Sequence, residues 1–434
     1  MARIEKDIER ARLELQDRLD VARTQAERNR LGQFATPTAL AADILEYARS
    51  VLPAEIAVRF LDPAFGTGSF YSALLYAFPS SRIATAAGYE IDPHYGRKAA
   101  ELWRSTPLKL SIADFTAVTP PDSDGARANL LICNPPYVRH HHIGTDEKRR
   151  LRRAVGHASG LTLGGLSGLY CYFLLLSHAW LAEDGLAGWL IPGEFMDVNY
   201  GRAVKDYLLT RVTLLRIHRF EPRDAQFGDA LVSSAVVWFK KAVPPANHVV
   251  EFTYGGSVVK PKMAGHVPAN VLREAPKWTK FPMVSDHVGL SHGRPTLSDL
   301  FTIKRGVATG DNGFFILTPE EVARHRLPAE FLRPILPSPR YLPSDEIEAD
   351  AEGSPVGIPR HFLLSCSLPE ELARVRYPSL WEYLQSGAEA GVSGRYLCRH
   401  RSPWYVQEDR PPAMFLCTYM GRMETRRASH FGSF

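Results

Sequence analysis

Cysteine is scarce in this chain, and a long apolar run is missing. The cysteines are odd in number, scattered, and without CxxC or Cys/His zinc spacing: Cys133, Cys171, Cys366, Cys398 and Cys417. Such usage favours reduced thiols in a cytosolic protein over a disulfide framework or a structural metal site. The most apolar segment, residues 169–192, is interrupted by His178, Glu183 and Asp184, so it lacks the continuity of a membrane span. No signal peptide is recognisable, and we expect a soluble, intracellular protein.

A strong charge of either sign is also absent. Lysine and arginine total 52 against 47 for aspartate and glutamate, which gives a net charge of +5. Only the distribution of so mild an excess can indicate a nucleic-acid surface. A hydrophobic content of 45% and a charged content of 23% are typical of a globular protein, and 434 residues predict two domains.

What is present is an alternation of strand-like and helix-like segments between residues 31 and 245. The expected strands cover residues 58–64, 84–92, 108–115, 128–136, 185–192, 212–220 and 233–241, and the expected helices cover residues 68–78, 93–104, 168–182 and 203–211. This alternation predicts an α/β fold with a doubly wound, mostly parallel sheet. Such sheets bind ligands beyond the carboxyl ends of their strands.

Two regions flank this alternation. Residues 1–30 are dense in charges of both signs, with apolar residues loosely at helical spacing, which predicts an amphipathic N-terminal helix. We favour a packing or dimerisation role for it over direct substrate contact. After the proline-rich segment 240–248, prolines and short strand-like pieces predominate, which predicts a second, α+β domain over residues 246–434. Its polar end, RRASHFGSF, has no evident closing element and leaves open whether this domain is complete.

The segment FLDPAFGTGSF places Asp62, Gly66 and Gly68 between an expected strand and an expected helix. Glycines let the main chain approach a ligand, and the NH groups that begin the helix favour an anionic group. The pattern is neither the dinucleotide-binding GxGxxG nor the phosphate-binding GK[ST]. An acid four residues before a GxG suits a ligand with an ammonium and a carboxylate, such as the methionine part of S-adenosylmethionine. In isolation, a GxG is as often a structural turn.

Acidic residues also end the next two expected strands. Glu90 lies 22 residues after Gly68, where nucleotide-binding α/β folds hold a ribose. Asp114 can accept a hydrogen bond from an exocyclic amine, and the ring of Phe115 can stack on a purine. Either acid alone would more often be a solvated loop residue. The set of three acids in this order predicts a pocket for an adenosine-bearing cofactor.

The fourth expected strand ends in NPPY, residues 134–137, where two consecutive prolines stiffen the main chain. An isolated NPPY is equally well a strand-terminating turn with a buried tyrosine. After the three acids, however, the chain resembles the amino-methylating DNA methyltransferases, specifically the N6-adenine enzymes of the TaqI-like and BsuBI/PstI-like group. These are class I S-adenosylmethionine-dependent methyltransferases. The resemblance rests on the segments LGQFATPTALAADIL, LDPAFGTGSF, GYEIDP, ADF, NPPYVR, LYCYFLLL and QFGDALVSSAVVWFKK.

The resemblance extends over residues 31–241 and implies a set of cofactor-binding residues. They are Thr36, Pro37, Asp62, Gly66, Gly68, Glu90, Asp114 and Phe115. Thr36 and Asp62 would lie at the methionine part of S-adenosylmethionine, and Glu90 would hold the ribose hydroxyls. Asp114 would accept from the adenine amine, with Phe115 packed on the adenine ring.

The same resemblance implies the residues that act on the target base. The catalytic turn would consist of Asn134, Pro135, Pro136 and Tyr137. Asn134 and the carbonyl of Pro135 would accept from the target amine, and Tyr137 would stack on the flipped base. Phe173 would line the base pocket, with Phe227 as its second wall, although Phe220 lies close by and could take that place.

The implied activity is methyl transfer from S-adenosylmethionine to the N6 amine of adenine in duplex DNA, with base flipping. We expect a cytoplasmic, prokaryotic enzyme of a restriction-modification or phage-defence system, with a cognate restriction endonuclease as partner and residues 246–434 as the DNA-recognition domain. The oligomeric state is not indicated. N4-cytosine methylation, amino-methylation of RNA or protein glutamine, and a DNA-binding subunit without catalysis remain as alternatives. The QFATP segment and the long carboxy-terminal region argue against RNA or protein, and the intact NPPY argues against lost catalysis.

Basic residues cluster directly after the NPPY turn. Residues 138–153 carry six basic residues against two acidic ones, and Arg139, Arg149 and Arg150 are candidates for DNA phosphate contact. A solvated helix face is the alternative. The three histidines 140–142 do not predict a metal site, because adjacent histidines point in different directions and methyl transfer from a sulfonium needs no metal.

A second basic stretch lies near the end of the chain. Residues 395–427 interleave arginines, beginning with Arg395, with aromatic residues. This mixture suits a surface that lies on DNA and suits ordinary arginine–aromatic packing equally.

Overall fold

The computed structural model describes residues 2–24, 27–28, 31–221, 234–283, 297–336, 338, 341–342, 346–351 and 355–416. The chain divides into two compact units, Met1–His292 and Gly293–Phe434. Within the described ranges, no helix is long and apolar enough to cross a membrane.

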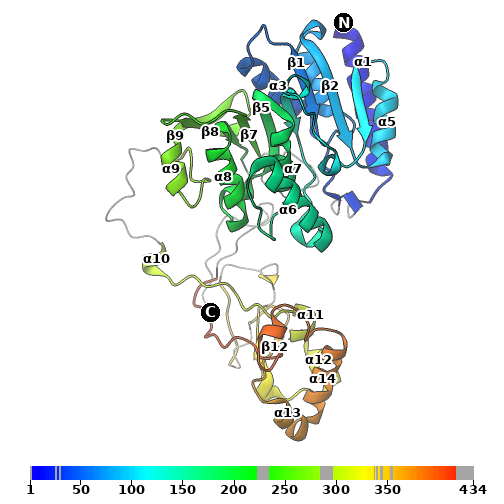
Figure 1. The fold of residues 1–434 in the computed structure, drawn as a ribbon. Helices are drawn as coiled ribbons and strands as arrows, with labels where there is room; N and C mark the ends of the chain where they lie inside the picture. The colour runs from blue at the N-terminus through cyan, green and yellow to red at the C-terminus, as the bar shows by residue number, and fades with distance from the viewer. Residues whose placement is uncertain are drawn as a thin grey trace. The chain divides into compact units, whose positions relative to one another are not determined.

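The first unit is built on a nine-stranded sheet in the order β3-β2-β1-β4-β5-β7-β6-β8-β9 (Figure 1). Its strands are β1 (Val58–Asp62), β2 (Ile83–Glu90), β3 (Leu108–Ile112), β4 (Ala128–Cys133), β5 (Leu181–Pro192), β6 (Thr213–Arg219), β7 (Ser234–Lys240), β8 (Val249–Gly256) and β9 (Pro261–Pro268). Strands β1 to β5 pair in parallel, and β7 runs antiparallel to both β5 and β6. The predicted doubly wound, mostly parallel sheet is confirmed.

Helices cover both faces of this sheet. They are α1 (Ala2–Val21), α3 (Thr38–Val51), α4 (Ser69–Ala77), α5 (Pro93–Trp103), α6 (Thr145–Ser159), α7 (Leu169–Leu176), α8 (Arg202–Thr210) and α9 (Ala269–Glu274). Successive side chains of a strand point to opposite faces. Leu130 of β4 therefore packs with α3, α4 and α5, and Leu131 packs with α6, α7 and α8. The strand is buried along its whole length, as expected for the centre of a doubly wound sheet.

Helix starts near the carboxyl edge of the sheet follow local signals. Asp92 caps α5 by accepting from the main-chain NH of His94 at 2.9 Å, and Pro93 is the first helical residue. Helix α4 begins directly after Gly68, whose φ of +93° suits glycine. These turns place the segments that follow β1 and β2 at one edge of the sheet.

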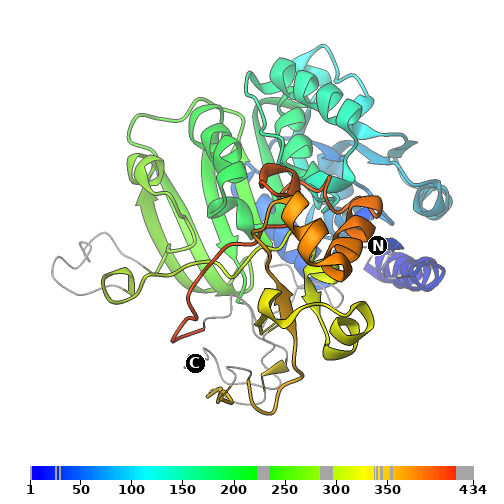
Figure 2. The ribbon, with the colours of Figure 1, turned by 90° about the horizontal axis from the view of Figure 1, so that it is seen from below.

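The last two strands extend the sheet beyond the predicted domain boundary at residue 245. Strand β8 pairs in parallel with β6, and β9 pairs antiparallel with β8. Figure 2 shows both strands, in light green, continuing the sheet next to β6 and β7. Trp278, which follows α9, is fully buried in the core on the α6–α8 face. The first unit therefore extends to His292 because its sheet and its core both need these residues.

The second unit has its own small core. Its three-stranded antiparallel sheet, in the order β10-β12-β11, consists of β10 (Ile316–Leu317), β11 (Leu332–Pro334) and β12 (Phe362–Leu364). Its helices are α10 (Leu297–Leu300), α11 (Asn312–Phe315), α12 (Pro319–His325), α13 (Glu370–Arg376) and α14 (Pro378–Glu389). The rings of Phe314 and Tyr383 stack at 4.6 Å, and Gly387 is required beside them because a Cβ there would lie 2.3 Å from Phe314. The α+β character expected for the carboxy-terminal domain is present in this unit.

Candidate active site

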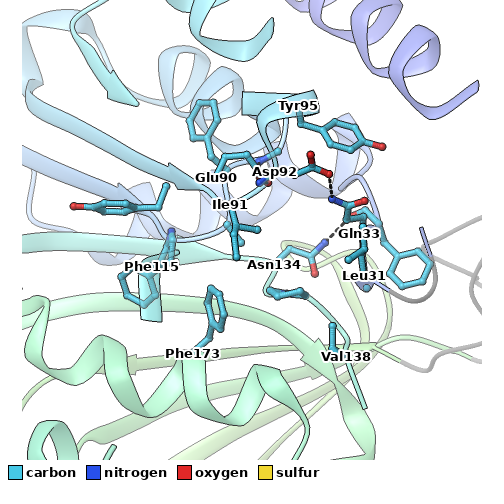
Figure 3. A pocket seen from close by; sticks show the side chains of 18 of the residues that line it. Leu31, Gln33, Glu90, Ile91, Asp92, Tyr95, Phe115, Asn134, Val138 and Phe173 are labelled. Carbon is cyan, nitrogen blue, oxygen red and sulfur yellow. Dashed lines mark hydrogen bonds between the residues drawn. The ribbon is translucent and has the colours of Figure 1, made fainter. Parts of the chain in front are cut away.

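A cavity of about 600 Å³ lies at the carboxyl edge of the parallel sheet. Its lining comes from the turns after β1, β2, β3 and β4, from residues 31–36, and from α1. Figure 3 shows Phe115 and Phe173 at one end, Gln33 and Asp92 at the other, and Asn134 between them. Strands β1 and β4 are neighbours at the point where the strand order reverses, which is where doubly wound sheets bind ligands.

Most of the predicted site residues line this one cavity. They are Thr36, Asp62, Gly66, Glu90, Asp114, Phe115, Asn134, Pro136 and Phe173. Four others are chain neighbours of lining residues and are not part of the lining: Pro37, Gly68, Pro135 and Tyr137.

Asp62 ends β1 and is almost completely buried. Its Oδ1 accepts from the main-chain NH of Ala64 at 3.1 Å. Burial raises the pKa of Asp62 to about 8, and the negative charge of Glu90 adds to this effect, although the hydrogen bond from Ala64 opposes it. A carboxyl so unfavourable to ionise in the absence of a partner is suited to a cationic ligand group.

Glu90 organises the glycine turn. One carboxylate oxygen accepts from the main-chain NH of Gly66 at 2.8 Å, and the other accepts from that of Asp92 at 2.8 Å. Burial raises the pKa of Glu90 in spite of these two hydrogen bonds. Gly66 has a φ of +58°, and a Cβ built on it would meet nothing within 4 Å, so its main chain faces open space. Glycine is needed at position 68 for a steric reason, because a Cβ there would lie 2.7 Å from the rings of Phe65 and Trp103.

Asp114 and Phe115 follow β3. Asp114 accepts from the NH and the hydroxyl of Thr116 at 2.9 and 2.7 Å, and it pairs with the guanidinium of Arg150 at 3.3 Å. The buried ring of Phe115 lies 5.5 Å from that of Phe173. Sequence reasoning assigned Arg150 to DNA phosphate. In the structure its guanidinium instead contacts Asp114 in the cavity wall, and it also donates to the carbonyl of Thr116 at 2.8 Å.

Asn134 leaves β4 and is fixed through its amide nitrogen. This nitrogen donates to the carbonyl of Phe34 at 3.0 Å and to Oγ1 of Thr36 at 3.2 Å. A main-chain carbonyl can only accept, so the contact with Phe34 defines which end of the amide is nitrogen. The other end, Oδ1, is buried and accepts no hydrogen bond from any part of the chain that the structure describes. A buried acceptor left without a donor costs about 1–3 kcal/mol, which points to a ligand donor at this atom.

Tyr137 anchors the other end of the NPPY turn. Its hydroxyl donates to the carbonyl of Leu190 at 3.1 Å, its ring lies 5.9 Å from that of Phe34, and burial raises its pKa. Its main-chain NH donates to the carbonyl of Gly32 at 3.3 Å. Gly32 has a φ of +64°, and a Cβ there would lie 2.3 Å from the nitrogen of Tyr137. Residues 31–36 and the NPPY turn are therefore held in direct contact, which only glycine at position 32 permits.

The remaining predicted residues are placed as follows. Arg139 and Arg149 are exposed, and Arg149 pairs with Asp146 on the same helix. Arg395, in the second unit, pairs with Asp311 at 2.9 Å. Phe227 lies outside the described residues. In the part of the chain that the structure describes, no group of three or more His, Cys, Asp or Glu side chains could hold a metal ion.

Sequence reasoning missed the contribution of α1 and of Gln33. Gln16 and Asp20 of α1 line the cavity together with Arg23, which follows the helix, and Gln33 donates to Asp92 at 2.9 Å. The sequence did contain a signal for the role of α1. One face of the helix, residues 12, 15, 16 and 19, combines arginine and glutamine with two leucines at helical spacing. Polar side chains on an otherwise apolar face indicate specific partners in the core.

Comparisons with known proteins identify two matching family models and several relatives. Residues 113–226 match the family model described as Eco57I restriction-modification methylase, and residues 277–423 match Type II methyltransferase M.Eco57I, C-terminal domain. The chain is 27% identical to Type II methyltransferase M.XamI of Xanthomonas campestris pv. amaranthicola over 84% of its own length and 67% of that relative. It is 24% identical to Type II methyltransferase M.AccI of Acinetobacter calcoaceticus over 92% of its length and 73% of that relative. Both matched segments are therefore similar to Eco57I-like restriction-modification methylases, in agreement with the resemblance expected from the sequence motifs.

The solved structures similar to this methylase include a putative class I S-adenosylmethionine-dependent methyltransferase from Listeria monocytogenes. The TM-score is 0.43 at 16% identity, over 52% of this chain and 67% of that one. S-adenosylmethionine is the methyl donor of the methylase. Its cavity fits this molecule, because the buried Asp62 suits the methionine ammonium, and Phe115 offers an apolar ring face to an adenine.

Proposed function

We propose that this restriction-modification DNA methyltransferase transfers a methyl group to the N6 amine of an adenine that has been flipped out of duplex DNA. The observation that carries the proposal is Oδ1 of Asn134, a buried acceptor beside the cavity without a donor among the described residues. An exocyclic amine has two N–H groups to offer, and Oδ1 of Asn134 and the carbonyl of Pro135 are the two acceptors that receive them.

The amine of adenine is a poor nucleophile because its lone pair is delocalised into the ring. Two fixed acceptors draw the N–H bonds out of the ring plane and localise the lone pair on nitrogen. S-adenosylmethionine, when bound, supplies an electrophilic methyl group. Because the acceptors are held by Phe34 and by the two prolines, they stabilise the charge that develops on nitrogen without reorganising. No strong base is needed, because the nitrogen becomes acidic only once it is methylated.

The target base must leave the duplex to reach these acceptors. We assign the stacking face to Tyr137, whose ring orientation is held by the hydrogen bond to Leu190. Phe173 lines the cavity together with Asn134, and its ring lies 5.5 Å from that of Phe115, so we assign it to the wall of the base pocket. The second unit, together with Arg139 and Arg149, is assigned to duplex DNA, and a restriction endonuclease is the proposed partner in a prokaryotic cytoplasm.

The decisive experiment is transfer of a tritiated methyl group from S-adenosylmethionine to unmethylated duplex DNA, followed by digestion to nucleosides. The expected product is N6-methyladenosine in its deoxy form, formed about 10²–10³-fold more slowly when Asn134→Ala replaces the parent protein. Label in N4-methylcytosine would change the base but keep the acceptor role of Asn134. Label only in RNA or protein would overturn the proposal.

A further inference from the structure

We propose that helix α1 is a structural wall of the S-adenosylmethionine site, in which Gln16 is a positioning residue for the glycine turn. The inference concerns the bound cofactor and holds whichever base receives the methyl group. It rests on three layers of contact between α1 and the carboxyl edge of the sheet.

The first layer is a buried ion pair that docks the helix. Arg12 is 1% exposed and pairs with Glu9 at 2.6 Å. The remaining hydrogen-bonding capacity of the pair is used by hydroxyl groups from three elements: Thr38 at the start of α3, Thr67 in the glycine turn, and Ser69 and Ser72 in α4. Burial opposes ionisation of Glu9, yet the hydrogen bonds from Arg12, Ser72 and Thr38 lower its pKa. A buried ion pair adds little stability by itself. Because the hydrogen-bonding groups of this pair are so fully used, we infer that the pair fixes the position of α1.

The second layer acts on the glycine turn. Oγ1 of Thr67 donates to Oε1 of Gln16 at 2.6 Å, and the carbonyl of Thr67 accepts from the indole of Trp103 at 2.9 Å. Thr67 is thereby held through its side chain by α1 and through its main chain by α5. Gly66, its neighbour, is held by Glu90 and exposes its main chain to the cavity. Gln16 therefore fixes the side of this turn that Glu90 does not reach.

The third layer closes the rim of the cavity. Gln16 donates to Asp20 at 2.9 Å, and Asp20 accepts from the hydroxyl of Tyr95 at 2.8 Å. Two residues after the end of α1, Arg23 pairs with Asp92 at 2.8 Å. Asp20, Arg23, Asp92 and Tyr95 all line the cavity, so these contacts run from the helix to the turn after β2. Figure 3 shows Asp92 and Tyr95 together at this rim. Displacement of α1 would open this side of the cavity to water.

The test uses the full chain and measures binding of S-adenosylmethionine by titration calorimetry in the absence of DNA. Loss of Arg12 would leave the buried carboxylate of Glu9 without its partner and endanger folding. The variants are therefore Gln16→Ala and Thr67→Val, with Thr67→Ser as the conservative counterpart that keeps the hydroxyl. We expect Gln16→Ala and Thr67→Val to weaken cofactor binding about tenfold, the size expected for one buried hydrogen bond. Thr67→Ser should lie closer to the parent protein. Arg10→Ala, on the exposed face of α1, is the matched control and should leave the dissociation constant unchanged.

A double-mutant cycle decides between positioning and general destabilisation. If the two side chains act through their shared hydrogen bond, the Gln16→Ala/Thr67→Val double variant should bind about as weakly as either single variant. In steady-state kinetics, KM for S-adenosylmethionine should rise while KM for DNA stays constant. An unchanged dissociation constant in folded Gln16→Ala protein, or fully additive losses in the cycle, would overturn the proposal. These binding measurements remain interpretable if the methylated base is not adenine.

Discussion

The glycine turn after β1 and the proline turn after β4 lie on neighbouring strands, yet they treat their polar groups in opposite ways. In the glycine turn, both oxygens of Glu90 are occupied by main-chain NH groups, and Thr67 is held from two sides. In the proline turn, the nitrogen of Asn134 is bound twice but its oxygen is left without a donor among the described residues. The shape of the glycine turn is thus fixed by hydrogen bonds from β2, α1 and α5, whereas the proline turn has one buried acceptor without a described donor, the atom that we propose receives the substrate amine.

The largest effect should come from removing that acceptor. Asn134→Ala deletes Oδ1 without touching the glycine turn, so we expect kcat to fall about 10²–10³-fold, as for removal of one preorganised group at a developing charge. The dissociation constant of S-adenosylmethionine should stay within about twofold, a difference well below the worth of one hydrogen bond. Single-turnover methylation and calorimetry measure the two quantities. Asn134→Asp keeps an acceptor but cannot donate to Phe34, so its activity should be intermediate.

A substitution of Asp62, beside the glycine turn, should lower cofactor affinity but raise the stability of the cofactor-free protein near neutral pH. Asp62→Asn removes the carboxylate expected to face the methionine ammonium, and we expect cofactor affinity to fall about 10–100-fold. Because the pKa of Asp62 in the folded protein, about 8, lies above the ordinary value of 3.8, the folded protein holds this proton more tightly than the unfolded chain does. The resulting stabilisation is complete below about pH 4 and is lost as the pH rises through 8.

The pH dependence gives this prediction a second measurement. The protein without cofactor should lose thermal stability between about pH 4 and about pH 8, because the unfolded chain releases this proton more readily than the folded protein does, and Asp62→Asn should remove that loss. Cofactor binding below pH 8 should release a proton, seen as a binding enthalpy that depends on the buffer. The exposed Asp17→Asn is the matched control. A parent-like pH profile in Asp62→Asn would contradict the assignment.

A smaller effect is expected at the far end of the proline turn. Tyr137→Phe keeps the ring but loses the hydrogen bond to Leu190, so transfer should slow only about fivefold, the equivalent of one neutral hydrogen bond. Tyr137→Ala removes the stacking face and should impair base flipping itself. Fluorescence of 2-aminopurine at the target position separates the two cases. Equal loss of the flipping signal in both variants would argue against a stacking role.

The smallest effects separate two adjacent arginines of α6. Arg149→Gln should weaken DNA binding about twofold and reduce its salt dependence by about one phosphate contact. Arg150→Gln should leave that salt dependence unchanged and instead weaken cofactor binding, because its guanidinium pairs with Asp114. Filter binding across a salt series and calorimetry measure both. Identical salt slopes for the parent protein and Arg149→Gln would exclude Arg149 from the DNA interface.

Sequence analysis anticipated the parts of this molecule whose signals are local. Strands β1 to β4 are followed closely by Asp, Glu or Asn-Pro, so the sequence alone was enough to predict that residues at their carboxyl ends gather at one cavity. The direction of Arg150 was not predictable from charge density, because it depends on Asp114, 36 residues away in the sequence. The contact of Gln16 with Thr67 spans 51 residues between polar side chains and leaves no periodic pattern.

The predicted domain boundary at residue 245 differs from the boundary between the two structural units for a similar reason. The prolines of segment 240–248 resemble a linker, and only the parallel pairing of β8 with β6 brings the next strands into the sheet. Parallel pairing requires a crossover connection, so no tight hairpin turn in the sequence identifies the partner strand. The sequence analysis found only short strand-like pieces after residue 245, and such pieces do not indicate which sheet they join.

The contact between Gly32 and Tyr137 has a thermodynamic consequence for how the two ligands bind. Residues 34 and 36 accept from the amide of Asn134, so if Thr36 contacts the cofactor as we propose, one stretch of main chain serves both ligands. Any shift of this stretch that favours one ligand changes the affinity for the other by a factor that must be the same in both directions. The degree to which S-adenosylmethionine tightens DNA binding is therefore also the degree to which DNA tightens the hold on S-adenosylmethionine.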